Sequence, residues 1–300
     1  SQTVTGVQTC ALPISLKYRR KFEPMIPGFV HISPPYQSEG IDSEQYFSAL
    51  KDAFFYENKK SIAAVLIEPI ISGGMVIPPD GFLKKIRDLC DEAGAYLIID
   101  EVISGHGRTG EMFAFEHFDV EPDMVATAKG ISSSVVPASS LTVNQRVLED
   151  LGIDNNLEQF LNEGHHVVTN HNHPLVCTAA KANMEFIQEN NLVNNARNVG
   201  DYLLDQLFLM NDKFQSLSNP RGKGSLAGIN ISASSSEYEL DTLVQKLADK
   251  AFDNGMILFG TTTHLRDTGV LHFRPALVAN NQDIDDAMEI FEKTLDEFID

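Results

Sequence analysis

The sequence predicts an α/β fold: a mostly parallel, doubly wound sheet followed by a small C-terminal α+β domain. Two continuous apolar runs, at residues 62–67 and 95–99, have the length and composition of buried parallel strands. Between them, residues 81–92 have the spacing of a helix that ends at Gly94. Strand, helix and strand joined by short connections are typical of a doubly wound parallel sheet.

Further elements extend this unit on both sides. Residues 43–56 have helical spacing, a third apolar run occupies 124–128, and residues 135–143 indicate another strand. We therefore expect residues 16–175 to form the C-terminal part of a large domain whose sheet is incomplete at the N-terminus.

The remaining residues, 176–300, predict the small α+β domain. Its expected helices lie at 175–187, 194–210, 237–254 and 283–299, and its expected strands at 221–231, 256–259 and 270–273. The glycines at 222 and 224 favour a tight turn that leads into a core strand.

Composition excludes several classes of function. An apolar fraction of 43% and a charged fraction of 22% describe an ordinary globular protein. The net charge of −19 argues against nucleic acid or an anionic membrane as a partner, and no apolar run reaches the length of a membrane span. The cysteines Cys10, Cys90 and Cys177 have neither metal-site nor disulfide spacing, which favours a reducing cytoplasm.

Two strand ends carry groups with complementary chemistry. Asp100 and Glu101 follow one buried run, and Lys129 follows the next. In open α/β sheets ligands bind outside the carboxyl ends of the strands, and a partly desolvated lysine becomes a nucleophile. Pyridoxal phosphate is a cofactor that uses both groups, because its aldehyde binds a lysine and its ring nitrogen binds an aspartate.

The motifs around these groups resemble those of class III aminotransferases, the ω-amino-acid transaminase branch of the fold-type I pyridoxal-phosphate enzymes. The matching pieces are Ile99-Asp100-Glu101-Val102, Gly105-His106-Gly107-Arg108-Thr109-Gly110, Pro122-Asp123-Met124-Val125 and Ala128-Lys129-Gly130. The family usually has phenylalanine or a similar apolar residue at the position of His106. The resemblance runs from about Phe22 to the C-terminus.

The resemblance implies roles for four cofactor-binding residues. Lys129 would form the Schiff base with pyridoxal phosphate and shuttle the proton, and Asp100 would bind the pyridinium nitrogen. Val102 would pack against one face of the ring, a role that hardly differs from core packing. Thr169 would bind the cofactor phosphate of the neighbouring subunit, which implies a homodimer. The alternative for Lys129 is a surface lysine that follows a strand.

Two further residues are implied to bind substrate. Arg274 would hold the substrate α-carboxylate through a bidentate pair, and Glu68 would neutralise it when an uncharged tail occupies the pocket. The alternatives are a structural arginine in a domain joint and a solvated acid at a strand end. His272 replaces an arginine of the family motif. The implied reaction transfers an amino group from an ω-amino acid or amine to pyruvate or 2-oxoglutarate, with an aminomutase or racemase as the alternative.

Other motifs have structural interpretations. The segment 105–110 lacks the setting and the lysine of a phosphate-binding loop, and Arg108 is a candidate for a structural ion pair. The histidines between His165 and His173 have no metal-site spacing, so we expect no metal. A nicotinamide dehydrogenase is disfavoured because no Gly-x-Gly-x-x-Gly follows a strand.

Residues 1–15 have a different character from the rest. They carry no charged side chain, and residues 4–15 can be encoded by a nucleotide sequence that resembles a sequencing-library adapter read in frame. We expect this segment to be an assembly artefact and a truncated gene to begin near Leu16. The family's phosphate loop and ring-stacking aromatic precede the segment at Phe22, so a second hypothesis is an inactive fragment that cannot hold cofactor.

Overall fold

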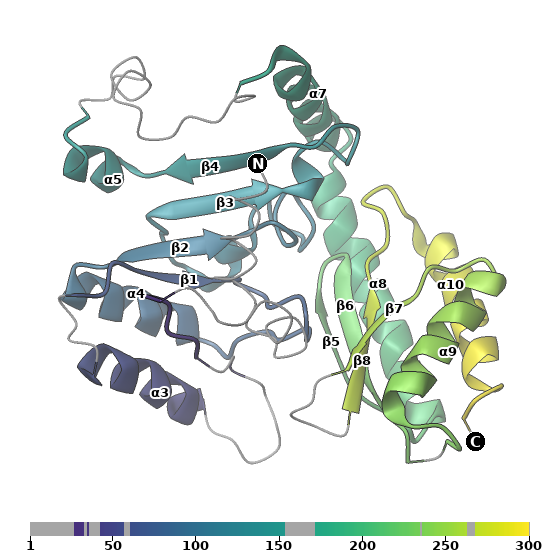
Figure 1. Ribbon diagram of the computed structural model, residues 1–300. Coiled ribbons are helices and arrows are strands. Elements are labelled where there is room, and N and C mark those ends of the chain that lie inside the picture. The colour runs from purple at the N-terminus through teal and green to yellow at the C-terminus, as the bar shows by residue number, and fades with distance from the viewer. Residues whose placement is uncertain are drawn as a thin grey trace.

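The computed structural model describes residues 27–32, 35, 43–56, 61–153, 172–234, 236–262 and 268–299. Two separate four-stranded sheets organise these residues, one in each half of the chain (Figure 1). In the described part of the chain no helix has both the length and the apolar character that a membrane span requires.

The first sheet has the order β1-β2-β3-β4. Strands β1 (Ala64–Ile67), β2 (Tyr96–Asp100) and β3 (Met124–Ala128) are parallel, and β4 (Ser139–Val143) pairs antiparallel to β3 at the edge. The register joins Ile67 to Ile99 and Asp100 to Ala126, so the carboxyl ends of the parallel strands reach the same edge. The predicted α/β class with a mostly parallel sheet is confirmed.

Helices α3 (Ser43–Tyr56) and α4 (Phe82–Ala93) pack beside this sheet (Figure 1). The buried face of α4 presents Phe82, Leu83, Ile86 and Cys90 to the strand residues Leu97 and Ile99. The helix ends where the sequence predicts, because Gly94 adopts a left-handed conformation with φ 72°. An amphipathic helix and a strand buried on one face thus form one core.

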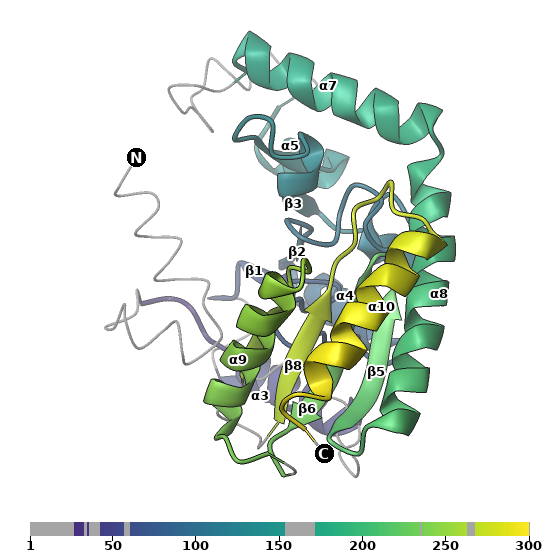
Figure 2. The same ribbon diagram turned by 90° about the vertical axis from the view of Figure 1, so that its right-hand side faces the viewer.

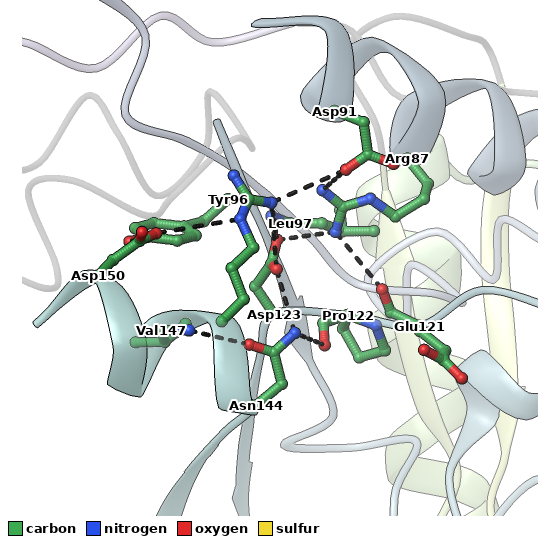
Figure 3. Close-up of polar contacts among 11 residues, drawn as sticks. Arg87, Asp91, Tyr96, Leu97, Glu121, Pro122, Asp123, Asn144, Val147 and Asp150 are labelled. Carbon is green, nitrogen blue, oxygen red and sulfur yellow. Dashed lines mark hydrogen bonds and ion pairs between the residues drawn. The ribbon is translucent and has the colours of Figure 1, made fainter. Parts of the chain in front are cut away.

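A polar network fixes the amino end of β3 (Figure 3). One oxygen of the buried Asp123 carboxylate accepts the Leu97 backbone N–H and the Arg87 Nη1–H, both at 2.7 Å. The other accepts Asn144 Nδ2–H at 3.1 Å and Arg146 Nη1–H at 3.3 Å. Asn144 also caps α5 (Gln145–Asp150) by accepting the Val147 N–H at 3.2 Å. These contacts join the starts of β2 and β3 to α4 and α5.

The second sheet is antiparallel, with the order β5-β6-β8-β7. Its strands are β5 (Leu217–Lys223), β6 (Leu226–Ser232), β7 (Phe259–Thr262) and β8 (Thr268–Phe273). Helices α8 (Leu192–Lys213), α9 (Leu240–Asp253) and α10 (Asn281–Leu295) pack on one face and enclose a core with Ile229, Leu271 and Phe273 (Figure 2). Helix α7 (Pro174–Glu189) leads into α8.

The predicted strand at 256–259 is wrong, because β7 begins only at Phe259. Gly255 has φ 98°, and the Met256 N–H binds the Ala251 carbonyl at 2.8 Å, so residue 256 still belongs to the termination of α9. The apolar residues 256–258 that follow Gly255 resemble the start of a strand in the sequence.

A third core joins the two sheets. It contains Ile70 and Met75 from the segment after β1, Ala114, and Leu226 and Val270 from the second sheet. In β8, Leu271 and Phe273 face the helices, whereas Val270 packs in this third core. Alternation along the strand therefore also directs His272 toward the first half of the chain.

Candidate active site

Three charged residues meet at the carboxyl edge of the first sheet. Glu68 follows β1, Asp100 is the last residue of β2, and Lys129 follows β3. Arg274 follows β8 in the second sheet and interacts electrostatically with Glu68 and Lys129. The structure thus brings together four of the six residues that the sequence analysis selected.

Lys129 has the properties of a nucleophilic amine. Burial lowers its pKa; Asp100 and Glu68 act in the opposite direction, and Arg274 lowers the pKa further. Lys129 has φ 44°, a left-handed conformation that is uncommon for residues other than glycine. Its turn is held from α7, where Asn183 Nδ2 donates to the Gly130 carbonyl at 2.8 Å.

Asp100 is oriented by the turn that follows β2. Its Oδ1 accepts the backbone N–H of Val102 at 3.0 Å, and its other oxygen accepts no hydrogen bond from the described residues. Val102 lies beyond the end of β2, so alternation along a strand does not place its side chain. Val102 is half-buried, and its packing against the cofactor ring stays a prediction.

Glu68 and Arg274 both form hydrogen bonds with Ser72. Glu68 Oε2 accepts the Ser72 N–H at 3.1 Å and the Ser72 hydroxyl at 2.8 Å. Arg274 Nη2 donates to the Ser72 carbonyl at 3.2 Å. Within the described part of the chain, no ion pair shorter than 4.0 Å joins the two side chains.

Burial changes the pKa of both partners. It raises the pKa of Glu68, against the lowering effect of the Ser72 hydrogen bonds, and it lowers the pKa of Arg274, against the effect of Glu68. Each group is therefore charged less readily than in water. A ligand or side chain of opposite charge stabilises the charged form of each.

Arg108 does not form the predicted ion pair. Its Nη1 donates to the backbone carbonyls of Ser225, at 3.3 Å, and Pro275. No carboxylate lies within ion-pair distance of it among the described residues. The guanidinium instead binds the backbone directly after Arg274. This role could not be predicted from the sequence, because the acceptors are backbone carbonyls of distant residues.

The loop that carries His106 packs against the lysine turn. His106 has φ 57° and is 3% exposed, and a Cβ added at Gly130 would lie 3.3 Å from the His106 Cβ. Both ring nitrogens are buried without a hydrogen-bond partner among the described residues. Burial lowers the pKa of this imidazole, which is therefore neutral at pH 7. Two buried nitrogens that the described residues leave without a partner make this histidine destabilising relative to an apolar ring.

Thr169 lies outside the described residues, as do His165, His166 and His171. His173 is described, and its Nδ1 accepts the Leu175 N–H at 3.2 Å at the start of α7. Elsewhere in the described ranges no group of His, Cys, Asp and Glu side chains has the arrangement of a metal site.

Sequence reasoning missed the residues that link the two sheets at the site: Ser72, Arg221, Thr261 and His272 as a hydrogen-bonding residue. The Ser-Gly-Gly segment after Glu68 is the one signal that could have indicated them, because two glycines leave the backbone carbonyls accessible. Their partners lie 146 to 202 residues away along the chain.

The fold is that of the fold-type I transaminases, and comparisons with known proteins identify the family. The family model of Aminotransferase class-III matches residues 5–295. An uncharacterized aminotransferase of Bacillus subtilis, YhxA, is 35% identical over 241 residues, which are 79% of this chain and 51% of the relative. The chain therefore belongs to the class III aminotransferases.

Solved transaminases have the same fold. An aminotransferase of Bacillus anthracis is 29% identical with a TM-score of 0.84, covering 94% of this chain and 64% of that one. A transaminase from the marine bacterium Virgibacillus is 27% identical with a TM-score of 0.80, covering 91% and 60%. The chain spans about half the length of the curated relative and less than two thirds of these two structures.

The residues present fit the cofactor of this family, pyridoxal phosphate. Lys129 offers an amine whose pKa is lowered by burial, and Asp100 offers a carboxylate oxygen without a partner among the described residues. Both stand at the edge where ligands of open α/β sheets bind. These are the two groups that the cofactor aldehyde and ring nitrogen require.

Proposed function

We propose that this chain carries the lysine and the substrate-binding residues of a pyridoxal-phosphate-dependent aminotransferase. Its donor is an ω-amino acid or amine, and its acceptor is pyruvate or 2-oxoglutarate. The observation that carries the proposal is the convergence of Lys129, Asp100, Glu68 and Arg274 on one sheet edge. Nothing in core packing requires four charged groups from two sheets to meet there.

Each residue has a chemical task. Lys129 would hold the cofactor through its aldehyde, and the free amine would move the proton at the reacting carbon of the substrate. Asp100 would hold the protonated ring nitrogen of the cofactor. Pyridoxal phosphate, when bound, supplies the aldehyde and an electron-accepting ring. The lowered pKa of Lys129 increases the fraction of amine available for both steps.

Arg274 and Glu68 account for two kinds of substrate in one pocket. Arg274 binds the α-carboxylate of the acceptor by a bidentate pair. Glu68 balances that charge when the donor presents an uncharged tail. Because Ser72 separates the two groups, the balance acts through space and through Ser72 rather than through a direct ion pair. Thr169 would complete the site as a phosphate ligand across a homodimer.

Trapping the cofactor on Lys129 tests the proposal. The chain is incubated with pyridoxal phosphate, reduced with borohydride and digested, and the modified lysine is identified by mass spectrometry. We expect the modification on Lys129, no visible absorbance band in Lys129→Ala, and an unchanged band in Lys181→Ala, whose side chain pairs with Glu185 on the surface of α7. Modification spread over surface lysines would refute the site.

Substrate roles are tested separately. Arg274→Ala should raise the Michaelis constant for the acceptor, 2-oxoglutarate, by about 100-fold, as expected for a lost charge-assisted pair. An amine without a carboxylate should be nearly unaffected. Equal losses for both substrates would refute the role of Arg274. Recovery of an isomerised or racemised product instead of a transaminated one would favour an aminomutase or racemase.

A further inference from the structure

Side chains from the second half of the chain form hydrogen bonds with the loop that follows Glu68. Four consecutive backbone carbonyls, those of residues 72, 73, 74 and 75, accept hydrogen bonds from three side chains of the second half of the chain. Arg274 binds the first at 3.2 Å, Thr261 the second at 2.9 Å, and Arg221 the third and fourth at 2.8 and 2.5 Å. Arg274 is therefore part of a continuous polar contact.

His272 lies behind this contact with a defined hydrogen-bond direction. Its Nε2 is 2.8 Å from the Thr261 hydroxyl. That hydroxyl has one proton, which it donates to the Gly73 carbonyl, so it must accept the His272 Nε2–H. The Nδ1 atom of the neutral ring then carries a lone pair, and it lies 3.5 Å from Arg274 Nη2.

The surroundings keep the ring neutral. His272 is 3% exposed, and burial together with Arg274 and Arg221 lowers its pKa to about 3. The acceptor presented to Arg274 is thus uncharged at pH 7. Unlike a carboxylate, a neutral acceptor orients a guanidinium without cancelling its charge.

We propose that His272 is a positioning residue for Arg274, acting with the Ser72 carbonyl to hold one guanidinium nitrogen while the other N–H groups stay available to a substrate carboxylate. This inference rests on the proposed carboxylate-binding role of Arg274. Phe259, which pairs with His272 across β7 and β8, supports the guanidinium from one side with its ring centroid 5.7 Å from Arg274 Cζ.

Three substitutions of His272 distinguish the function of Nδ1 from that of Nε2. In His272→Asn the amide oxygen can replace Nδ1 as the acceptor for Arg274, whereas in His272→Gln the longer amide can replace Nε2 as the donor to Thr261. His272→Phe keeps a ring of similar size and removes both functions. A residue that only fills space would not distinguish asparagine from glutamine in this way.

Binding of glutarate, a dicarboxylate without a reactive amino or keto group, measures the effect. By calorimetry on the full chain loaded with pyridoxal phosphate, we expect about three- to tenfold weaker binding for His272→Gln and His272→Phe, as for one lost hydrogen bond. His272→Asn should stay within about twofold of the parent. Equal affinities for all three variants and the parent overturn the positioning role. Unchanged affinity in Arg274→Ala overturns instead the carboxylate site on which it rests.

A second measurement needs no change at His272. Histidine-selective ¹⁵N NMR of the unsubstituted chain should show His272 as the Nε2–H tautomer with an unprotonated Nδ1. Thr261→Val removes the hydroxyl acceptor and should mix the two tautomers. A predominant Nδ1–H tautomer in the unsubstituted chain overturns the assignment, because that nitrogen could not then accept from Arg274.

Discussion

His106→Phe should stabilise the protein. The imidazole is 3% exposed, and neither Nδ1 nor Nε2 has a hydrogen-bond partner in the described part of the chain. A buried polar group without a partner costs about 1–3 kcal/mol. A phenyl ring removes that cost, keeps the edge contact with Phe113 at a centroid distance of 5.7 Å, and adds some crowding against Gly130. We expect a net gain of about 1–2 kcal/mol in the free energy of unfolding.

Urea unfolding followed by circular dichroism measures this gain as a shift in midpoint at constant m-value. His117→Phe is the matched control. That histidine is half-buried, and its Nε2 lies 3.0 Å from the Thr109 carbonyl and 3.1 Å from the Thr109 hydroxyl. The same substitution should therefore destabilise at residue 117. A loss of stability at both positions would refute the argument that unpaired ring nitrogens decide whether phenylalanine stabilises or destabilises the protein.

The advantage of His106→Phe should grow as the pH falls. Burial lowers the pKa of His106 in the folded state, so below about pH 6.5 the unfolded chain binds a proton that the folded chain does not. The free energy of unfolding of the parent protein therefore decreases as the pH falls, whereas His106→Phe lacks this effect. The difference between variant and parent should widen by up to about 1.4 kcal/mol per pH unit. A constant difference between pH 7 and pH 5 would contradict a neutral buried ring.

Further predictions concern the network and the turns that hold the two sheets. Burial raises the pKa of Asp123, but the Leu97 N–H and Arg87 outweigh it and leave the pKa below its usual value, so its stabilisation is lost as the pH falls below about 4. Asp123→Asn should cost about 3 kcal/mol at pH 7 in urea unfolding, with a smaller penalty at pH 3. Gly224→Ala, where a Cβ would lie 2.4 Å from the Thr109 carbonyl carbon, should lower the stability by about 3 kcal/mol or more. Gly255→Ala, with open space around its Cβ, should cost only about 1 kcal/mol.

The sequence predicted best what depends on neighbouring residues. The strands ending at Asp100 and Ala128 and the helix ending before Gly94 follow from apolar runs and a left-handed stop, which are local signals. The start of β7 was wrong because the apolar residues that close α9 resemble a strand. Arg108 was a candidate for a structural ion pair, yet its acceptors are backbone carbonyls more than 100 residues away.

In the candidate site, too, local features could be predicted and contacts between distant segments could not. Lys129 and Asp100 are predictable because each marks the end of a buried strand, and parallel pairing brings those ends together. The geometry of Arg274 was not predictable, because it depends on carbonyls that a Gly-Gly segment exposes and on the direction of one threonine proton. Hydrogen bonds between distant segments leave no periodicity in the sequence.

The position of Ser72 changes how the substrate pair can work. Its N–H and hydroxyl bind Glu68 while its carbonyl binds Arg274, so one residue contacts both members of the pair. Because Thr261 and Arg221 hold the next three carbonyls, Ser72 cannot shift without moving the second sheet against the first. Arg274 Nη2 therefore has a fixed acceptor in the Ser72 carbonyl, while the other N–H groups of the guanidinium stay available to a substrate carboxylate. The loop thus holds the arginine in one position for both kinds of substrate.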